Sequence, residues 1–140
     1  MDIVDPSLPQ QIVRAALLGN AAVVAFVGQR VRGSHAVDPD ATDPTYPSLV
    51  FAYSGGDTIQ SGVYADLTYG LTAYSRTSAA EALAAYGAGA NVLHSERVVL
   101  DGVAAWVVAR ETARPRAGWD ESHRAHYAVG RWRIQVFDAG

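Results

Sequence analysis

The stretch VYADLTYGLTAYSRTSAAEALAAYGAGANVL, residues 63–93, decides the fold. Apolar and polar residues alternate over its first half, from Val63 to Tyr74, and this period of two predicts a long strand with one buried face. Ser78 and Glu81 have the spacing of a capping box, which predicts that a helix begins there. The core-facing stripe of that helix is predicted to contain Leu83, Tyr86, Ala90 and Leu93. A strand followed by an amphipathic helix that folds back over it makes the centre of an α+β core.

The segments on either side extend this core. Ser7 is predicted to cap a helix that ends at Gly19 and Asn20, and a short second helix follows over residues 21–26. Further strands are predicted at residues 30–32, 48–53, 98–100, 103–112 and 123–137, with turns at residues 54–57 and 101–102 and a β-bulge near Gly130. The chain is therefore predicted to be one α+β domain, residues 1–140, in which two main helices pack against a mostly antiparallel sheet.

Two segments are predicted to be long irregular loops. Residues 34–47 contain three prolines and three aspartates, and residues 114–122 contain proline, glycine and charged side chains. Both offer little apolar area to bury locally. We expect both loops to be mobile in an isolated subunit and ordered in an assembly.

Composition excludes several classes of protein. The chain has no cysteine, so disulfides and thiolate chemistry are excluded. No apolar run approaches membrane-spanning length, and the first five residues lack the basic start of a signal peptide, so a cytoplasmic protein without a membrane partner is expected. The net charge of −3 argues against general nucleic-acid binding.

Charge is distributed unevenly along the chain. All eleven basic residues are arginine, and residues 97–133 contain seven of them, whereas residues 1–60 contain six aspartates against three arginines. Arginine presents a planar fork that suits paired contacts with carboxylates. This asymmetry would suit an acidic edge meeting a basic edge on a neighbouring copy, although the charges could equally cancel inside one fold.

No catalytic, cofactor or metal site is predicted. His123 and His126 are three apart on a predicted strand and so point to opposite faces. The aspartates of residues 38–43 lack the glycine and the closing glutamate of a calcium loop. No nucleophile elbow is present. In Arg131-Trp132-Arg133, both arginines are predicted on one face of a strand and Trp132 on the other, in the core.

One longer pattern resembles a known family. Leu17-Leu18 precede a short alanine- and valine-rich helix that ends in VGQRV, residues 27–31. A proline-bearing loop then delivers YPSLVF, residues 46–51. LTAYSR at residues 71–76 leads into the alanine-rich helix, and RWRIQV at residues 131–136 closes the chain. This pattern, from Ile12 to Val136, resembles the tail completion (tail terminator) proteins of long-tailed bacteriophages and related prophage or gene-transfer particles.

The resemblance implies a structural function. Members of that family have an α+β fold and assemble as a six-membered ring that caps the tail tube, ends its polymerisation and offers a surface to the head–neck connector. It therefore implies a homo-hexamer with two partners, the tail-tube protein and the connector protein, located in the virion after assembly in the host cytoplasm. It implies no active site and no cofactor.

Two other functions remain open from the sequence. A head–neck connector or stopper subunit also forms rings. A small-molecule-binding or hydrolytic α+β domain could instead use the polar strand face at Tyr64, Asp66 and Tyr74.

The charge pattern gives candidate interface residues for a ring. A closed ring needs contacts between two different patches, and both charged segments are predicted to lie in edge loops. Trp119 is predicted to add apolar contact. The candidate residues are Asp38, Asp40, Asp43, Arg114, Arg116, Trp119, Arg131 and Arg133.

Overall fold

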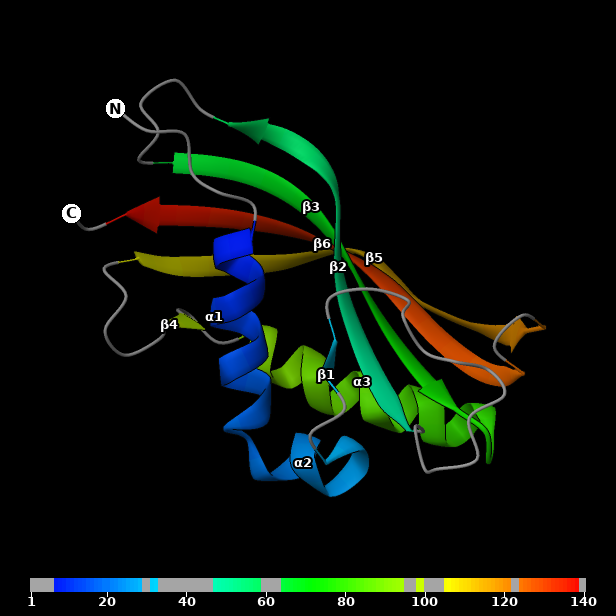
Figure 1. Cartoon of the computed structure of the whole chain (residues 1–140). Coiled ribbons are helices and arrows are strands. Elements are labelled where there is room, and N and C mark those ends of the chain that lie inside the picture. The colour runs from blue at the N-terminus through cyan, green and yellow to red at the C-terminus, as the bar shows by residue number, and fades with distance from the viewer. Residues whose placement is uncertain are drawn as a thin grey trace.

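The computed structural model describes residues 7–28, 31–32, 47–58, 64–94, 98–99, 105–121 and 124–138 (Figure 1). Its elements in chain order are α1 (Ser7–Leu18), α2 (Ala21–Val27), β1 (Val31–Arg32), β2 (Ser48–Thr58), β3 (Tyr64–Ser75), α3 (Ala79–Leu93), β4 (Val98–Val99), β5 (Ala105–Asp120) and β6 (Ala125–Asp138). Within these residues, no helix is both long and apolar enough to cross a bilayer.

The strands form one sheet in the order β1-β2-β3-β6-β5-β4. β1 runs parallel to β2, and the other neighbouring pairs are antiparallel. β3 and β6 pair without interruption, from Tyr64 opposite Phe137 to Ser75 opposite His126. The predicted α+β fold with a mostly antiparallel sheet is confirmed.

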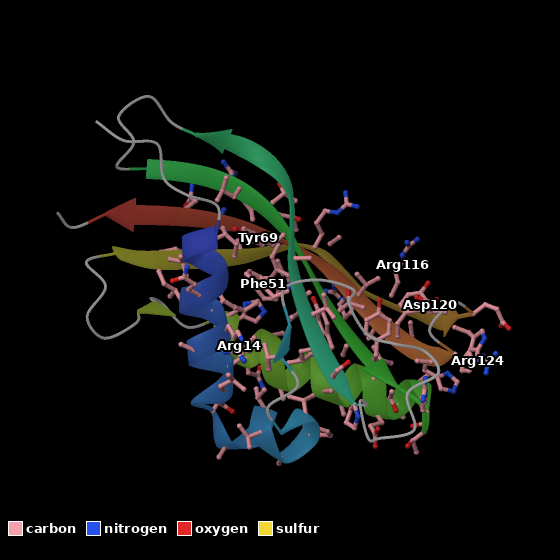
Figure 2. The ribbon with its side chains drawn as sticks, viewed as in Figure 1. Arg14, Phe51, Tyr69, Arg116, Asp120 and Arg124 are labelled. Carbon is pink, nitrogen blue, oxygen red and sulfur yellow. The ribbon has the colours of Figure 1, made fainter. Side chains whose placement is uncertain are left out.

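The alternating residues of β3 place one face of the sheet in the core. Leu67, Tyr69, Leu71 and Ala73 are each at most 2% exposed. Figure 1 shows the helices gathered on this side of the sheet. Tyr69 also stacks on Phe51 of β2, with ring centroids 4.5 Å apart (Figure 2). The predicted burial of one β3 face is confirmed.

α3 begins with the predicted cap, but Ser75 replaces part of the predicted box. Ser78 Oγ accepts a hydrogen bond from the Glu81 amide at 3.0 Å, as expected. The Ser78 amide donates to Ser75 Oγ at 3.3 Å rather than to Glu81, and the Thr77 amide donates to the same oxygen at 3.0 Å. Ser75 Oγ in turn donates to the Glu81 carboxylate at 2.7 Å. The end of β3 and the start of α3 therefore share one hydrogen-bonded unit.

The buried stripe of α3 starts one residue earlier than predicted. Tyr86, Ala90 and Leu93 are buried, but Leu83 is 40% exposed, so its predicted place in the core is wrong. The helix instead buries small residues, namely Ala82, Ala85, Gly89 and Ala90. A Cβ added at Gly89 would lie 3.3 Å from Leu49 Cδ1, so these small residues bring the helix close to the sheet. If the Leu83 side chain faced the sheet, it would hold the helix further away.

The first two helices cover the rest of the core face. α1 buries Ile12, Val13 and Leu17. Asn20 caps α2, because its Oδ1 accepts from the amides of Ala22 and Val23 at 3.0 and 3.2 Å. The expected short second helix is confirmed.

One predicted turn and one predicted loop belong to strands in the structure. Residues 54–57 were expected to turn the chain, but β2 continues to Thr58, with a bulge between Tyr53 and Gly55 that keeps it paired with β3. Residues 114–120 belong to β5, so the predicted loop there is wrong. Pro115 fits because the described part of β5 beyond Val107 pairs with β6 alone, and an edge position needs no donor from proline.

The bulge expected in β6 near Gly130 lies in β5 instead. β5 shifts register between Glu111 and Ala113 and again between Ala113 and Arg116, whereas β6 keeps its register with β3. Residues 34–46 and the predicted turn at residues 101–102 lie outside the described residues.

Candidate subunit interface

The sheet face opposite the helices carries five exposed arginines, which we call the arginine face: Arg110, Arg114, Arg116, Arg131 and Arg133. Trp132 lies between the two β6 arginines in sequence and is 0% exposed in the core. The prediction that Trp132 is buried and that Arg131 and Arg133 point away from it is confirmed. Arg116 projects from β5 away from α3 (Figure 2).

Strand register brings these arginines together. Arg110 of β5 lies directly opposite Arg133 of β6. Like charges at directly opposed positions destabilise a pair of strands, because they repel at short range. The register shifts in β5 keep Ala113 and Arg116 opposite Arg131 and Val129, so both remain on the arginine face. The bulges thus align two arginine-bearing strands.

A groove of about 490 Å³ lies within the arginine face. We call it the arginine groove; it is lined by Arg114, Arg116, Arg131, Gly70, Ala113 and Val129, and it also touches Gly130. A Cβ added at Gly70 would have no neighbouring atom within 4 Å, so the floor of the groove is open at this point. A smaller hollow of about 20 Å³ is lined in part by Arg110 and Arg133.

A hydrogen-bonded chain on the helix side holds β5 and β6 beneath the groove. Trp132 Nε1 donates to the Tyr86 hydroxyl at 3.0 Å, and that hydroxyl donates to Glu111 Oε2 at 2.5 Å. Burial of the phenol, reinforced by its hydrogen bond to Glu111, raises the pKa of Tyr86 above its usual range. A Cβ at Gly130 would overlap the Tyr86 hydroxyl. The chain therefore ties α3 to both strands where the first β5 bulge begins.

Trp119 lies apart from the arginine groove. It is 51% exposed, and Arg116 and Trp119 are three residues apart on β5. They therefore point to opposite faces of the sheet. Trp119 packs edge-on against His126 at 5.0 Å between ring centroids, and its Nε1 donates to Glu121 Oε2 at 2.7 Å. Arg114, Arg116, Arg131 and Arg133 are thus brought together, and Trp119 is separated from them.

Other predicted residues fall elsewhere. Asp38, Asp40 and Asp43 lie outside the described residues, as do the side chains of Tyr64 and Asp66. Tyr74, suggested for a small-molecule site, is 2% exposed and belongs to a second cluster with Val50 and Ala125. Over the residues that are described, no group of three or more His, Cys, Asp or Glu side chains could hold a metal ion.

Sequence reasoning missed Arg110, Gly70 and the Tyr86–Glu111 contact. The alternation of the predicted strand at residues 103–112 could have placed Arg110 opposite the buried face. Gly70 and the Tyr86–Glu111 contact depend on which strands become neighbours, and the local sequence carries no signal for this.

Comparison with known proteins gives a likeness of fold. No family model matches the chain, and no curated protein matches it significantly. Among solved structures, the fold is similar to a chain in the virion of a native gene transfer agent particle, with a TM-score of 0.60 and 20% sequence identity. The match covers 91% of this chain and 93% of that chain. The two chains therefore share one fold along nearly their whole length.

Proposed function

We propose that this chain is a structural virion protein of a phage-like particle and that it acts there as a tail terminator. In this function a ring of copies, six in number, caps the tail tube, ends its polymerisation and joins the tail to the head–neck connector. The observation that carries the proposal is the fold shared with a gene transfer agent virion chain over 91% of this chain and 93% of that one. The match extends over nearly the whole length of both chains, so it does not rest on one common motif.

The two faces of the molecule suit a capping function. A subunit that ends a polymer must bind the last tube subunit through one surface and must not bind a further tube subunit through a different surface. The helices cover one face of this sheet (Figure 1). The other face presents the exposed arginines of the arginine face. The chain therefore offers neighbours two surfaces of different chemistry.

The proposed function requires neither catalysis nor a cofactor. The arginine groove is open to solvent, and no metal-binding cluster occurs within the described ranges. Such a groove suits recognition of another protein surface better than enclosure of a small substrate. We therefore include in the proposal that the protein is not an enzyme.

Electron microscopy with the cognate tail-tube protein tests this function. Purified chain should form rings, bind one end of preformed tubes and stop further growth when added during tube polymerisation. Tube length should fall as the ratio of this chain to tube protein rises. Rings that bind the connector but leave tube growth unchanged would favour a connector or stopper subunit instead. A monomer that binds neither protein would overturn the structural function as a whole.

A further inference from the structure

The arginine groove concentrates positive charge on a chain that is acidic overall. Within the described part of the chain, no carboxylate pairs with Arg114, Arg116 or Arg131. Two nearby acids are engaged elsewhere, because Glu111 accepts from Tyr86 on the helix side and Glu121 accepts from Trp119. The groove is therefore a cationic surface without a described counter-charge, in a chain of net charge −3.

The chemistry of the groove favours carboxylates as its ligand. Arginine forks match carboxylates in paired hydrogen bonds. A volume of about 490 Å³ has room for several short side chains, and the open floor at Gly70 allows a backbone to approach the strands. Aspartates in an extended segment would fit such a shallow groove.

The chain itself contains closely spaced aspartates. Residues 38–43 contain three aspartates and no basic residue. They lie in sequence between β1 and β2, which form one edge, whereas β5 lies towards the other edge. A heterologous contact in a ring places one edge of a subunit against a different patch of the next copy.

We propose that the arginine groove binds the aspartate segment, Asp38 to Asp43, of a second copy of this chain. The inference rests on the proposed ring function and names the contact that closes the ring. The contact is heterologous, because an acidic segment of one copy meets a basic groove on the next, and repeating it gives a closed ring where the rotation between copies closes. Because it consists of exposed charge pairs, it should guide docking and weaken as salt rises.

A peptide titration tests the groove directly. A fluorescent peptide of residues 34–47 should bind the full-length chain saturably in anisotropy measurements, and binding should weaken at least tenfold between low and high salt. The double variant Arg114→Glu/Arg116→Glu should lose at least tenfold in affinity. The matched control Arg76→Glu/Arg124→Glu makes the same charge change at exposed sites outside the groove and should bind as wild type does. A peptide with all three aspartates changed to asparagine should not bind.

Assembly measurements separate this inference from the proposed function. Sedimentation velocity should show fewer rings for Arg114→Glu/Arg116→Glu, and adding Asp38→Arg/Asp40→Arg to the same chain should partly restore them. Circular dichroism should show that all variants fold. If wild type forms tube-capping rings and the groove variant forms them equally well, the groove inference is overturned and the function stands.

A different result would overturn the contact between copies. If wild-type chain ignores the peptide but the variant Asp38→Asn/Asp40→Asn/Asp43→Asn binds it, the groove holds the chain's own segment. If peptide binding follows the groove residues but wild type caps no tubes, the terminator function fails while the groove's preference for carboxylates stands.

Discussion

Tyr86 joins three elements through one hydroxyl. It lies on α3, receives a hydrogen bond from Trp132 of β6 and donates one to Glu111 of β5. Trp132 is 0% exposed, so no solvent can replace a lost partner of its indole nitrogen. Leaving a buried donor unsatisfied costs more than the bond itself contributes.

Tyr86→Phe is therefore expected to lower the free energy of unfolding by about 1–3 kcal/mol. Urea denaturation at pH 7 measures the change. Tyr127→Phe, which removes a phenol hydroxyl from a half-buried ring on the other sheet face, is the matched control and should cost less. Equal losses for the two variants would show that the Tyr86 network adds nothing to stability.

The same hydroxyl predicts a pH dependence. The folded chain raises the pKa of Tyr86, chiefly by burial. The contribution of the protonated hydroxyl to folding stability is therefore fully present below the usual tyrosine pKa of about 10. Above about pH 10 the unfolded chain loses this proton first, and stability should fall by up to about 1.4 kcal/mol per pH unit. Denaturation midpoints from pH 8 to pH 11 should show the gap between wild type and Tyr86→Phe narrowing above pH 10.

Two glycines should respond in opposite directions to alanine. Gly130→Ala would press a Cβ into the Tyr86 hydroxyl. It is expected to lower the free energy of unfolding by about 1–3 kcal/mol, because overpacking a core has this effect. Gly87 lies in α3 with no atom within 4 Å of an added Cβ, so Gly87→Ala should stabilise by about 0.5–1 kcal/mol. Thermal unfolding of both variants tests the pair. A neutral Gly130→Ala would mean that the Tyr86 ring moves aside freely.

At the scale of elements, the junction of β3 and α3 is held chiefly by Ser75. This residue is 0% exposed, and its hydroxyl takes part in three hydrogen bonds, whereas Ser78 Oγ accepts one. The loss of a helix cap such as Ser78 costs about 0.5–2 kcal/mol.

Ser75→Ala should accordingly destabilise the chain more than Ser78→Ala. Chemical denaturation compares the two, and Thr77→Ala, an exposed change in the same turn, should be nearly neutral. The opposite order would show that Ser78 alone begins the helix.

The element scale also shows what local sequence can predict. β3 was predictable because its alternation is strict and one of its faces is in the core. β5 was not, because Arg114-Pro115-Arg116 has the composition of a loop, and only pairing with β6 and two bulges make it a strand. The apparent bulge in β6 had a similar cause. Ala125 is buried on one face of β6, whereas Ala128 and Trp132 are buried on the other. Apolar residues on both faces make the alternation in the sequence look as if it changes phase, which is why a bulge was expected there.

The candidate interface was predictable in its charges but not in its arrangement. Counting arginines identified Arg114, Arg116, Arg131 and Arg133, and the structure gathers them on one face. Trp119 was grouped with Arg116 because the segment was taken for a loop. On a strand the two residues point apart, so sequence proximity was misleading.

At the scale of the whole molecule, β5 limits unwanted association through its sheet edge. Pro115, two bulges and three arginines interrupt the described edge beyond Val107, and such features discourage the addition of a further strand. Pro115→Thr is expected to increase aggregation on prolonged incubation, measured by thioflavin fluorescence and light scattering. Ala113→Thr, a threonine substitution two residues away that keeps the proline, should leave aggregation unchanged. Equal behaviour of both variants would show that proline does not protect this edge.

The open floor at Gly70 has a practical consequence. The chain contains no cysteine, so Gly70→Cys would introduce a unique thiol within the arginine groove. Because an added Cβ meets no atom within 4 Å, the fold should accept this change and leave the sulfur accessible. An environment-sensitive dye attached there would report groove occupancy in real time, and subunit exchange between rings could be followed without altering any arginine.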